Sequence, residues 1–369
     1  MNCAEIDTIL SNPNDYARML KARGRVIVGG PCSYLPEEII MASGAHPWRI
    51  FGDASQISLA ESHLQAYCCS VARGILEEGL SGELSFLDGI IFPHTCDTLQ
   101  RLSDIWRINI KNCFHLDIVH PVVLNSPSAL EYAHDRLINF KDNLQEKLSV
   151  TINDADLERA IALSNRIREQ LRELYRLRSE HPARFEACEI PTVMKCAMLM
   201  EREKLSSWLR TLIADKRLAA AFPSINDGKR VMLVGGVCYY PNIYDLLARA
   251  GGVVVYDDLC VGSRYFDFDV PTDKPPLLAL AERIVARAPC PAKHAGLEAR
   301  GQRITQLAKS NGVEGIIFLQ TKFCDPHAFD YPYLKEATGS IPSLLLEIGD
   351  ELPPEGQLRT RCEAFFEAL

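Results

Sequence analysis

The sequence lacks any run of about 18 uninterrupted apolar residues, the length that a membrane-spanning helix requires. Its first residues also lack the basic, apolar and small-residue pattern of an export signal. Basic residues are not in excess, because 40 Lys and Arg stand against 48 Asp and Glu and the formal net charge is −8. We therefore expect a cytoplasmic protein that binds neither membranes nor nucleic acid.

Three kinds of local binding motif are also missing. The chain has no Gly-x-x-x-x-Gly-Lys-Ser/Thr loop and no Gly-x-Gly-x-x-Gly fingerprint, so neither a P-loop nor a dinucleotide site is predicted. It has no Cys-x-x-Cys pair, the arrangement that usually presents two ligands to zinc. If the reaction needs ATP hydrolysis, another protein has to supply it.

What the sequence does have is cysteine. Thirteen cysteines occur among 369 residues, an odd number in a chain that is 47% apolar and large enough to fold without disulfides. In a reducing compartment such thiols are buried small side chains, reactive groups or metal ligands. Their positions have to separate these roles.

The chain contains two similar α/β halves. Residues 25–28 form a β-branched run that ends in Gly-Gly and is followed by Cys32, and residues 230–234 lead in the same way to Gly-Gly and Cys238. A second repeat relates residues 88–92, followed by Thr95 and Cys96, to residues 314–318, followed by Thr321 and Cys324. This recurrence predicts an internal duplication. Long charged helical patterns lie between the halves, from about residue 154 to residue 217.

We therefore predict two similar Rossmann- or flavodoxin-like parallel-sheet domains, at residues 1–150 and 226–369, with a helical linking segment at residues 151–225. In such sheets the loops that follow the strands lie at one edge, where ligands bind. Cys32, Cys96, Cys238 and Cys324 should all lie at such edges. If the two edges face each other, several thiols would converge on one cleft.

The position of each cysteine in the sequence indicates whether it is a candidate metal ligand or a core residue. We favour metal ligation for Cys96 and Cys324, because the duplication repeats them at strand ends, and packing for Cys238, which precedes a bulky apolar loop. Of the adjacent pair Cys68 and Cys69, at most one should face the cleft. The remaining cysteines outside the strand-end loops are expected to be core residues: Cys3, Cys113, Cys188, Cys196 and Cys362.

Other polar residues at strand ends have two interpretations each. Arg264 follows a strand and could bind a phosphate or carboxylate, or it could pair with Asp257 or Asp258. His94 and His327 flank the duplicated cysteines, and a hydrogen-bonded structural histidine is the favoured interpretation of each.

Several motifs together resemble the 2-hydroxyacyl-CoA dehydratase and benzoyl-CoA reductase family. They are CSYLPEEII at residues 32–40, CSVAR at 69–73, TCDT at 95–98, DDLC at 257–260 and KFCDP at 322–326. The resemblance covers nearly the whole chain in the same order. It implies a [4Fe-4S] cluster held by Cys69, Cys96 and Cys324, with one iron site open to a small ligand or substrate. It also implies an acyl-CoA substrate, a separate ATP-dependent iron-sulfur activator and a homologous second subunit in a heterodimer.

The resemblance leaves four functions open. The residues after Cys96 and the DDLC loop look more like the aryl-CoA reductase branch, which passes electrons into an aromatic ring. The dehydratase branch instead expels a hydroxyl group through a ketyl radical anion. A homodimer with a double-cubane [8Fe-9S] cluster would need further thiols, for which Cys32, Cys68, Cys260 and Cys290 are available. A non-catalytic electron-relay or scaffold subunit is the fourth alternative.

Overall fold

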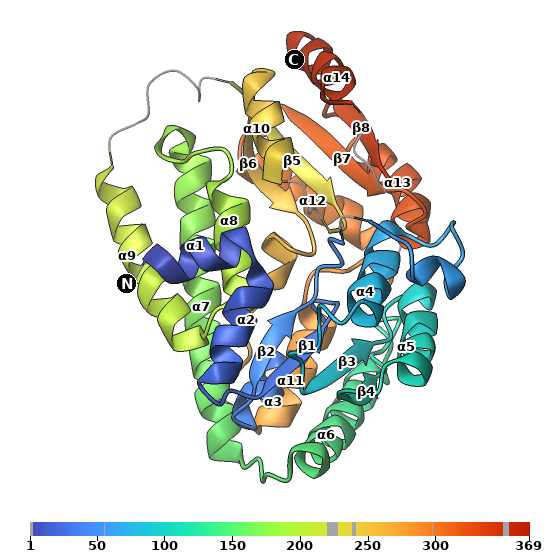
Figure 1. Ribbon diagram of the computed structural model, residues 1–369. Helices are drawn as coiled ribbons and strands as arrows, with labels where there is room; N and C mark the ends of the chain where they lie inside the picture. The colour runs from blue at the N-terminus through green and yellow to red at the C-terminus, as the bar shows by residue number, and fades with distance from the viewer. Residues whose placement is uncertain (1–2, 55, 220–227, 238–240, 297, 350–353) are drawn as a thin grey trace. The chain divides into compact units, whose positions relative to one another are not determined.

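The computed structural model describes residues 3–54, 56–219, 228–237, 241–296, 298–349 and 354–369. The chain divides into two compact units, each assembled from separate segments. The first unit comprises Met1–Ile167, Cys196–Ser206 and Phe268–Arg287. The second comprises Arg168–Lys195, Ser207–Asp267 and Ala288–Leu369. Each unit contains one four-stranded sheet (Figure 1).

The sheet of the first unit is parallel and has the strand order β2-β1-β3-β4. Its strands are β1 Ile27–Gly30, β2 His46–Arg49, β3 Gly89–Pro93 and β4 Phe114–Ile118. Its helices are α1 Cys3–Ser11, α2 Pro13–Ala22, α3 Glu37–Ala42, α4 Ser70–Leu80, α5 Asp97–Asn109, α6 Ala129–Leu148 and α11 Pro276–Ala286, with η1 Ala60–Ser62. Every residue of β1, β2 and β3 is buried, as expected for parallel strands that are covered on both faces.

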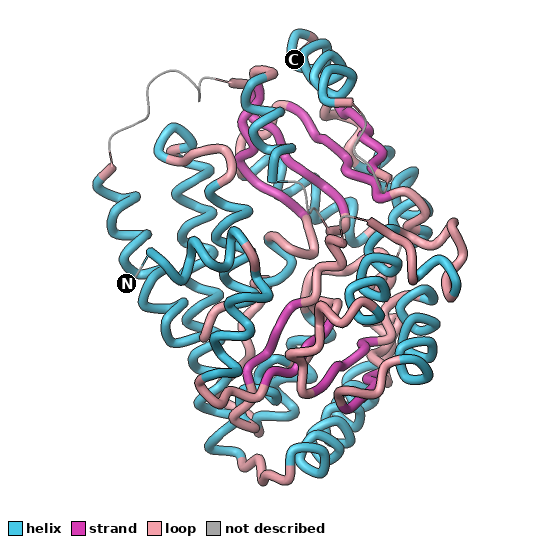
Figure 2. The backbone as a smooth tube through the Cα atoms, in the orientation of Figure 1, coloured by secondary structure: helices cyan, strands magenta, loops and turns pink. Residues whose placement is uncertain are grey.

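The sheet of the second unit repeats this topology in the order β6-β5-β7-β8, again with parallel strands. Its strands are β5 Lys229–Gly235, β6 Gly252–Asp258, β7 Gly315–Thr321 and β8 Ser343–Ile348. The accompanying helices are α10 Pro241–Arg249, α12 Ala299–Ser310, α13 Asp325–Ala337 and α14 Glu355–Glu367, with η3 Ser263–Tyr265. In both sheets, helices flank the strands (Figure 2). The predicted α/β class with two similar parallel-sheet units is confirmed.

The alternation of side chains along β5 and β7 explains how the second sheet is covered. Val231 and Leu233 point into a core with residues of α10 and α14. The alternate residues of β5, Met232 and Val234, point to the other face and pack in a second core with residues of α12 and α13. Because successive strand side chains alternate between faces, this continuous apolar run requires helices on both sides.

After β4, the described chain up to residue 219 is mainly helical, as its charged periodic pattern predicts. After α6 it consists of α7 Asp154–Glu180, η2 Pro182–Arg184, α8 Glu189–Leu199 and α9 Arg202–Leu218. The division between the two units passes through these three long helices. The contiguous domain boundaries at residues 150 and 226 stay a prediction.

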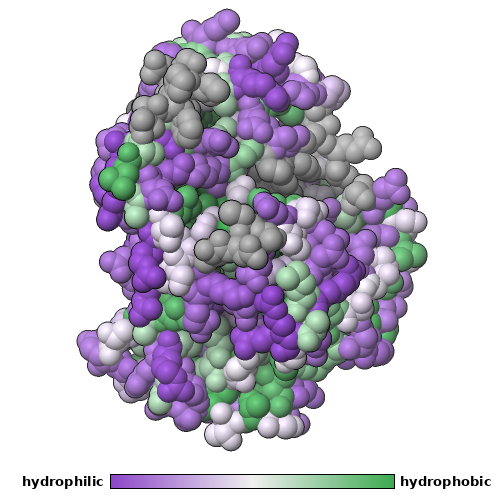
Figure 3. Space-filling model, turned by 60° about the vertical axis from the view of Figure 1, so that its left-hand side comes forward, coloured by the Kyte–Doolittle hydropathy of each residue, from purple (hydrophilic) through white to green (hydrophobic). Residues whose placement is uncertain are grey.

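Hydrophilic residues cover most of the molecular face drawn in Figure 3, and hydrophobic residues are scattered among them. Within the described part of the chain, no helix is both long and apolar enough to cross a membrane.

Candidate functional site

Cys96 and Cys32 lie at the carboxyl edge of the first sheet. Cys96 has an extended backbone and immediately precedes α5, and only His94 and Thr95 separate it from the end of β3. Cys32 lies in the loop after β1, and the hydroxyl of Thr95 donates a hydrogen bond to its sulfur over 3.6 Å. The loops after β1 and β3 therefore meet at this edge, as the sequence predicts.

Two side chains hold the loop that carries Cys32. The guanidinium of Arg287 donates a 2.8 Å hydrogen bond to the carbonyl oxygen of Ser33 and lies 4.1 Å above the ring centre of Tyr34. The ring of His120, which is 1% exposed, is hydrogen-bonded through Nε2 to the carbonyl oxygen of Tyr34 at 2.9 Å. These contacts fix the backbone on the carboxyl side of Cys32.

Cys69 occupies the same local position at α4 that Cys96 has at α5. Its backbone is extended, with φ −60° and ψ 147°, and the helix starts at the next residue. Further along α4, Gly74 touches the backbone of Gly52, because a Cβ on Gly74 would lie 2.2 Å from the Gly52 carbonyl oxygen. This close approach packs the chain that leaves β2 directly against α4.

His94 is hydrogen-bonded, as the structural interpretation favoured from the sequence expects. Its Nε2 lies 2.8 Å from Oδ1 of Asp117, the penultimate residue of β4. Ser103 of α5 donates to the same oxygen over 2.5 Å. The shared carboxylate ties the segment before Cys96 to the end of β4.

Cys324 is the third cysteine that immediately precedes a helix, in this case α13. It follows Phe323, a non-glycine residue with the left-handed backbone angle φ 61° and a side chain that is 44% exposed. A bulky residue rarely adopts this conformation, and such strain is concentrated at functional sites. The turn between β7 and α13 is therefore a strained turn that carries a thiol.

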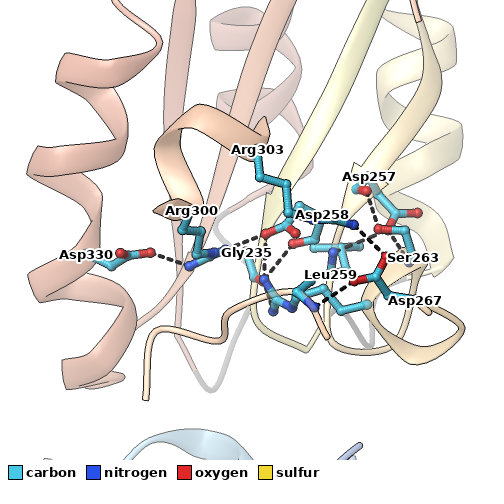
Figure 4. Close-up of polar contacts among 11 residues, drawn as sticks. Gly235, Asp257, Asp258, Leu259, Ser263, Asp267, Arg300, Arg303 and Asp330 are labelled. Carbon is cyan, nitrogen blue, oxygen red and sulfur yellow. Dashed lines mark hydrogen bonds and ion pairs between the residues drawn. The ribbon is translucent and has the colours of Figure 1, made fainter. Parts of the chain in front are cut away.

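The second unit also contains a buried charged cluster around Asp258, the last residue of β6 (Figure 4). Arg264 donates a 2.6 Å hydrogen bond to Asp258 Oδ2 and a 2.7 Å hydrogen bond to the carbonyl oxygen of Gly235. Although burial opposes it, the guanidinium groups of Arg264 and Arg300 hold the pKa of Asp258 well below its ordinary value. Of the two interpretations of Arg264, the pairing with an aspartate is the one observed.

Cys260 and Cys290 belong to the surroundings of the same arginine. Burial lowers the pKa of Arg264, but the Asp258 carboxylate and the thiols of Cys260 and Cys290 outweigh it and raise the pKa above its ordinary value. The amide of Cys260 also donates a 3.0 Å hydrogen bond to the carbonyl oxygen of Gly236, after β5. The loops after β5 and β6 thus meet at the carboxyl edge of the second sheet.

Asp257 shapes the loop between Cys260 and Arg264. Its Oδ1 accepts hydrogen bonds from the amides of Ser263, at 2.8 Å, and Leu259, at 3.2 Å. Its Oδ2 accepts a 2.7 Å hydrogen bond from the hydroxyl of Tyr175 on α7. The loop is therefore built around one buried carboxylate.

The remaining cysteines divide by burial. Cys196 and Cys362 are fully buried, as predicted for core residues, whereas Cys113 and Cys188 are half-buried. Cys188 still packs against the core beneath α10 and α14. No disulfide occurs among the cysteines whose side chains are described; the side chain of Cys3 and the whole of Cys238 lie outside the described residues.

The chemistry of the predicted ligands fits an iron-sulfur cluster, since thiolates are its protein ligands and the start of a helix favours a thiolate. Cys69, Cys96 and Cys324 are half-buried, and each immediately precedes a helix. Among the described residues, no three His, Cys, Asp or Glu side chains lie together in a group that could hold a metal ion. Cys69 and Cys96 belong to the first unit and Cys324 to the second, so their assembly into one centre stays a prediction.

Sequence reasoning did not single out Arg300, Asp330 or Glu78. The first two complete the charged cluster of the second unit, and Glu78 is a buried carboxyl group of the first. Nothing in the spacing of these residues distinguishes them from the exposed charges of an ordinary helix. Their roles become visible only from their burial and from their interaction partners in the folded chain.

Comparison with known proteins gives consistent results along the whole chain. The β subunit of (R)-2-hydroxyglutaryl-CoA dehydratase from Acidaminococcus fermentans is 30% identical, over 99% of this chain and 98% of that protein. The β subunit of (R)-phenyllactyl-CoA dehydratase from Clostridium sporogenes is 29% identical, over 98% and 96%. One of the subunits of benzoyl-CoA reductase from Thauera aromatica is 25% identical, over 91% and 89%.

A family model agrees with these similarities. The model described as 2-hydroxyglutaryl-CoA dehydratase, D-component, matches residues 32–369, from the first strand-end cysteine to the end of the chain. The motifs that carried the resemblance lie in the loops after β1, β3, β6 and β7 of the two parallel sheets and at the start of α4, which follows β2. The chain belongs to the 2-hydroxyglutaryl-CoA dehydratase D-component family, and its relatives include dehydratase β subunits and a benzoyl-CoA reductase subunit.

Proposed function

We propose that the chain is the β-type subunit of an enzyme that removes water from a 2-hydroxyacyl-CoA thioester. The observation that carries this proposal is the similarity to two dehydratase β subunits over nearly the full length of both partners. The similarity to the benzoyl-CoA reductase subunit is lower and covers less of the chain. These identities outweigh the motif-level likeness to the reductase branch.

The proposed cofactor is one [4Fe-4S] cluster held by Cys69, Cys96 and Cys324. When bound, the cluster would supply a single low-potential electron to the thioester of the acyl-CoA. The chain's own contribution would be to present three thiolates at helix starts, where unpaired backbone amides favour the anion. Apolar surroundings and few hydrogen bonds to sulfur would then tune the reduction potential.

The proposed partners are a homologous second subunit and an ATP-dependent iron-sulfur activator. The relatives are themselves named as single subunits of larger enzymes, which indicates that this chain also works beside another chain. The sequence has no P-loop, so the proposed ATP hydrolysis belongs to the activator.

The first test is the iron and acid-labile sulfide content of protein purified without oxygen. We expect about four irons per chain, and a loss of iron in Cys69→Ala, Cys96→Ala and Cys324→Ala. Cys113→Ala is the matched control, because Cys113 is also half-buried but lies before β4 instead of after a strand. About eight irons would replace the proposal with the double-cubane alternative, and iron-free wild-type protein would overturn the cluster.

A second candidate function is ring reduction of an aromatic acyl-CoA, which the sequence around Cys96 favours: TCDT at residues 95–98, then Asp104, Ile105 and Trp106. Electron stoichiometry separates the two reactions. Elimination of water from a 2-hydroxyacyl-CoA gives an enoyl-CoA with no net redox change, so the electron acts catalytically. Reduction of an aromatic ring to a diene consumes two electrons and two protons.

The discriminating measurement is the consumption of reduced viologen per product in the complete system of both subunits and activator. Dehydration predicts many enoyl-CoA products per electron supplied. Stoichiometric consumption with benzoyl-CoA would instead assign the reductase function. Iron retained in an assembly that turns over neither substrate would favour the electron-relay alternative.

A further inference from the structure

Two arginines converge on one carboxylate at the carboxyl edge of the second sheet. Oδ2 of Asp258 accepts hydrogen bonds from Arg264, at 2.6 Å, and from Arg300 of α12, at 2.5 Å. The exposed fractions are 0% for Asp258, 2% for Arg264 and 3% for Arg300. Charges so completely removed from water are rare unless they are paired, so this geometry is closely specified.

Arg300 extends the cluster to a second helix. One of its terminal nitrogens pairs with Asp258, and the other pairs with Asp330 on α13 (Figure 4). Arg264 connects the same carboxylate to the carbonyl oxygen of Gly235, the last residue of β5. The ends of β5 and β6 are therefore linked through charged groups to α12 and α13.

The spacing of residues on α13 relates this link to Cys324. Cys324 immediately precedes α13, and His327 and Asp330, three residues apart in its first two turns, are neighbours on the surface of the helix. His327 approaches the sheet edge closely, since its Nε2 would lie 3.2 Å from a Cβ on Gly236. Asp330 and His327 therefore hold the first two turns of α13 near the strand ends, and Cys324 directly precedes these turns.

The buried ion cluster is not needed simply to hold α12 and α13 against the sheet. Ile304 and Ala308 of α12 and Leu334 of α13 already pack with β5 and β7 in an apolar core. Apolar replacements of a buried ion pair are often as stable as the pair itself, because the charges lose their hydration. What the pair adds is a fixed geometry for the two helices, as directional hydrogen bonds do.

That geometry is needed most at the start of α13. Phe323 holds a left-handed backbone conformation that a non-glycine side chain disfavours. Such a turn persists only when its surroundings hold it in place. An anchor in the second turn of α13 meets this requirement.

We infer that Arg300 is a positioning residue: by holding Asp330 against the end of β6, it fixes the first turn of α13 and the thiol of Cys324. The inference rests on the proposed function only in its consequence for cluster binding. The arrangement of the helix start is a property of the unloaded chain and can be tested there.

The test compares Arg300→Met with Arg303→Met in the full chain. Arg303 lies one turn further along α12 and donates a 2.8 Å hydrogen bond to Asp267 instead of to α13. The readout is the rate at which iodoacetamide alkylates Cys324 in the iron-free protein, followed by peptide mass spectrometry with Cys69 and Cys96 as internal references. We expect Arg300→Met to accelerate alkylation of Cys324 by about fivefold through local opening of the helix start, and Arg303→Met to leave it unchanged.

A second variant separates the loss of the positioning contact from general destabilisation of the fold. Arg300→Met alone leaves Asp330 without its partner, so Arg300→Met combined with Asp330→Leu replaces the pair by apolar groups. Both variants should accelerate alkylation at Cys324 but not at Cys69 or Cys96, and both should retain less iron after reconstitution. Unchanged alkylation of Cys324 in the folded double variant would overturn the inference. If alkylation accelerates but wild-type protein binds no iron, the positioning role stands and the proposed function fails.

Discussion

Thr95 and Cys32, 63 residues apart in the chain, are joined by a hydrogen bond from the threonine hydroxyl to the cysteine sulfur over 3.6 Å. The bond connects the loop after β1 with the loop after β3, and Thr95 directly precedes Cys96. It places Cys32 beside a proposed cluster ligand. Polar contacts beside an iron-sulfur centre, such as this one, are among the features that tune its reduction potential.

From this contact we predict that Cys32 supports the site without binding iron. Cys32→Ala should keep about four irons per chain, because the proposed cluster takes three other cysteines. Its cluster reduction potential should differ from wild type, since the Thr95 hydroxyl loses its acceptor and reorients. Iron analysis and a redox titration followed by electron paramagnetic resonance measure both quantities. Loss of half the iron from an eight-iron protein would show that Cys32 is a ligand of a larger cluster.

Glu78 predicts a pH dependence of stability that has nothing to do with the thiols. Burial, together with the nearby Asp53 and Glu83, raises the pKa of Glu78 from 4.5 to about 8. The folded protein therefore holds a proton on this carboxyl group between these two pH values, whereas the unfolded chain has released it. Stability conferred by this group must fall as the pH rises from about 4.5 to about 8.

Glu78→Gln keeps the shape of the neutral carboxyl group and removes its titration. Thermal unfolding measured between pH 5 and pH 9 should show that the variant gains stability over wild type as the pH rises. The matched control is Glu77→Gln at the next position. Although burial opposes it, amide hydrogen bonds from Ala60 and Ser58 lower the pKa of Glu77, so this control should lose stability at neutral pH. Parallel pH profiles for Glu78→Gln and wild type would contradict the prediction.

Gly74 gives a steric prediction about the helix that follows Cys69. A Cβ at Gly74 would lie 2.2 Å from the carbonyl oxygen of Gly52, and Gly52 itself has the left-handed angle φ 67°. Because the contact is with backbone and not with a flexible side chain, Gly74→Ala must displace the strand-end loop from α4. We expect a cost of about 2–3 kcal/mol in the urea unfolding profile. Gly356→Ala on α14, where a Cβ would meet no atom within 4 Å, should be neutral or slightly stabilising.

From the sequence, the strand-end positions of the cysteines could be predicted, but the side chains that surround them could not. Repeated runs of β-branched residues ending in Gly-Gly or in a Thr and Cys identified the strands, because a buried parallel strand needs a continuous apolar run. The topology then placed Cys32 and Cys96 at one edge, and the contact with Thr95 agrees with this. Each of these inferences depends on local sequence and on a general rule of connection.

The charged cluster could not be predicted in the same way. Asp258 lies 42 residues before Arg300, and Asp330 lies 30 residues after it. Partners so far apart are chosen by packing between helices, and a buried arginine has the same local sequence signature as an exposed one. The pairing of Arg264 was narrowed to Asp257 or Asp258 only because these residues are close in the chain. The division into two units cuts through α7, α8 and α9, which no local pattern indicates.

Tyr175 and Asp257 give the last prediction, which concerns the loop that carries Cys260. Both side chains are 2% exposed, and the tyrosine hydroxyl donates to Oδ2 of the carboxylate over 2.7 Å. Burial raises the pKa of Asp257, while hydrogen bonds from Ser263, Tyr175 and Leu259 oppose this rise. Removing the hydroxyl leaves one carboxylate oxygen buried without this donor, which typically costs about 1–3 kcal/mol.

Tyr175→Phe should therefore destabilise the protein and raise the pKa of Asp257 further. A carboxyl group with a higher folded pKa loses more stability as the pH rises through that value, so the deficit of the variant should grow from acidic to neutral pH. Urea unfolding at pH 5 and pH 8 measures it. The control is Tyr256→Phe, which removes a hydroxyl from the ring that packs edge-on against Tyr175 at 5.5 Å but leaves the Tyr175 hydroxyl in place. An equal loss in both variants, independent of pH, would mean that ring packing and not the hydrogen bond stabilises this loop.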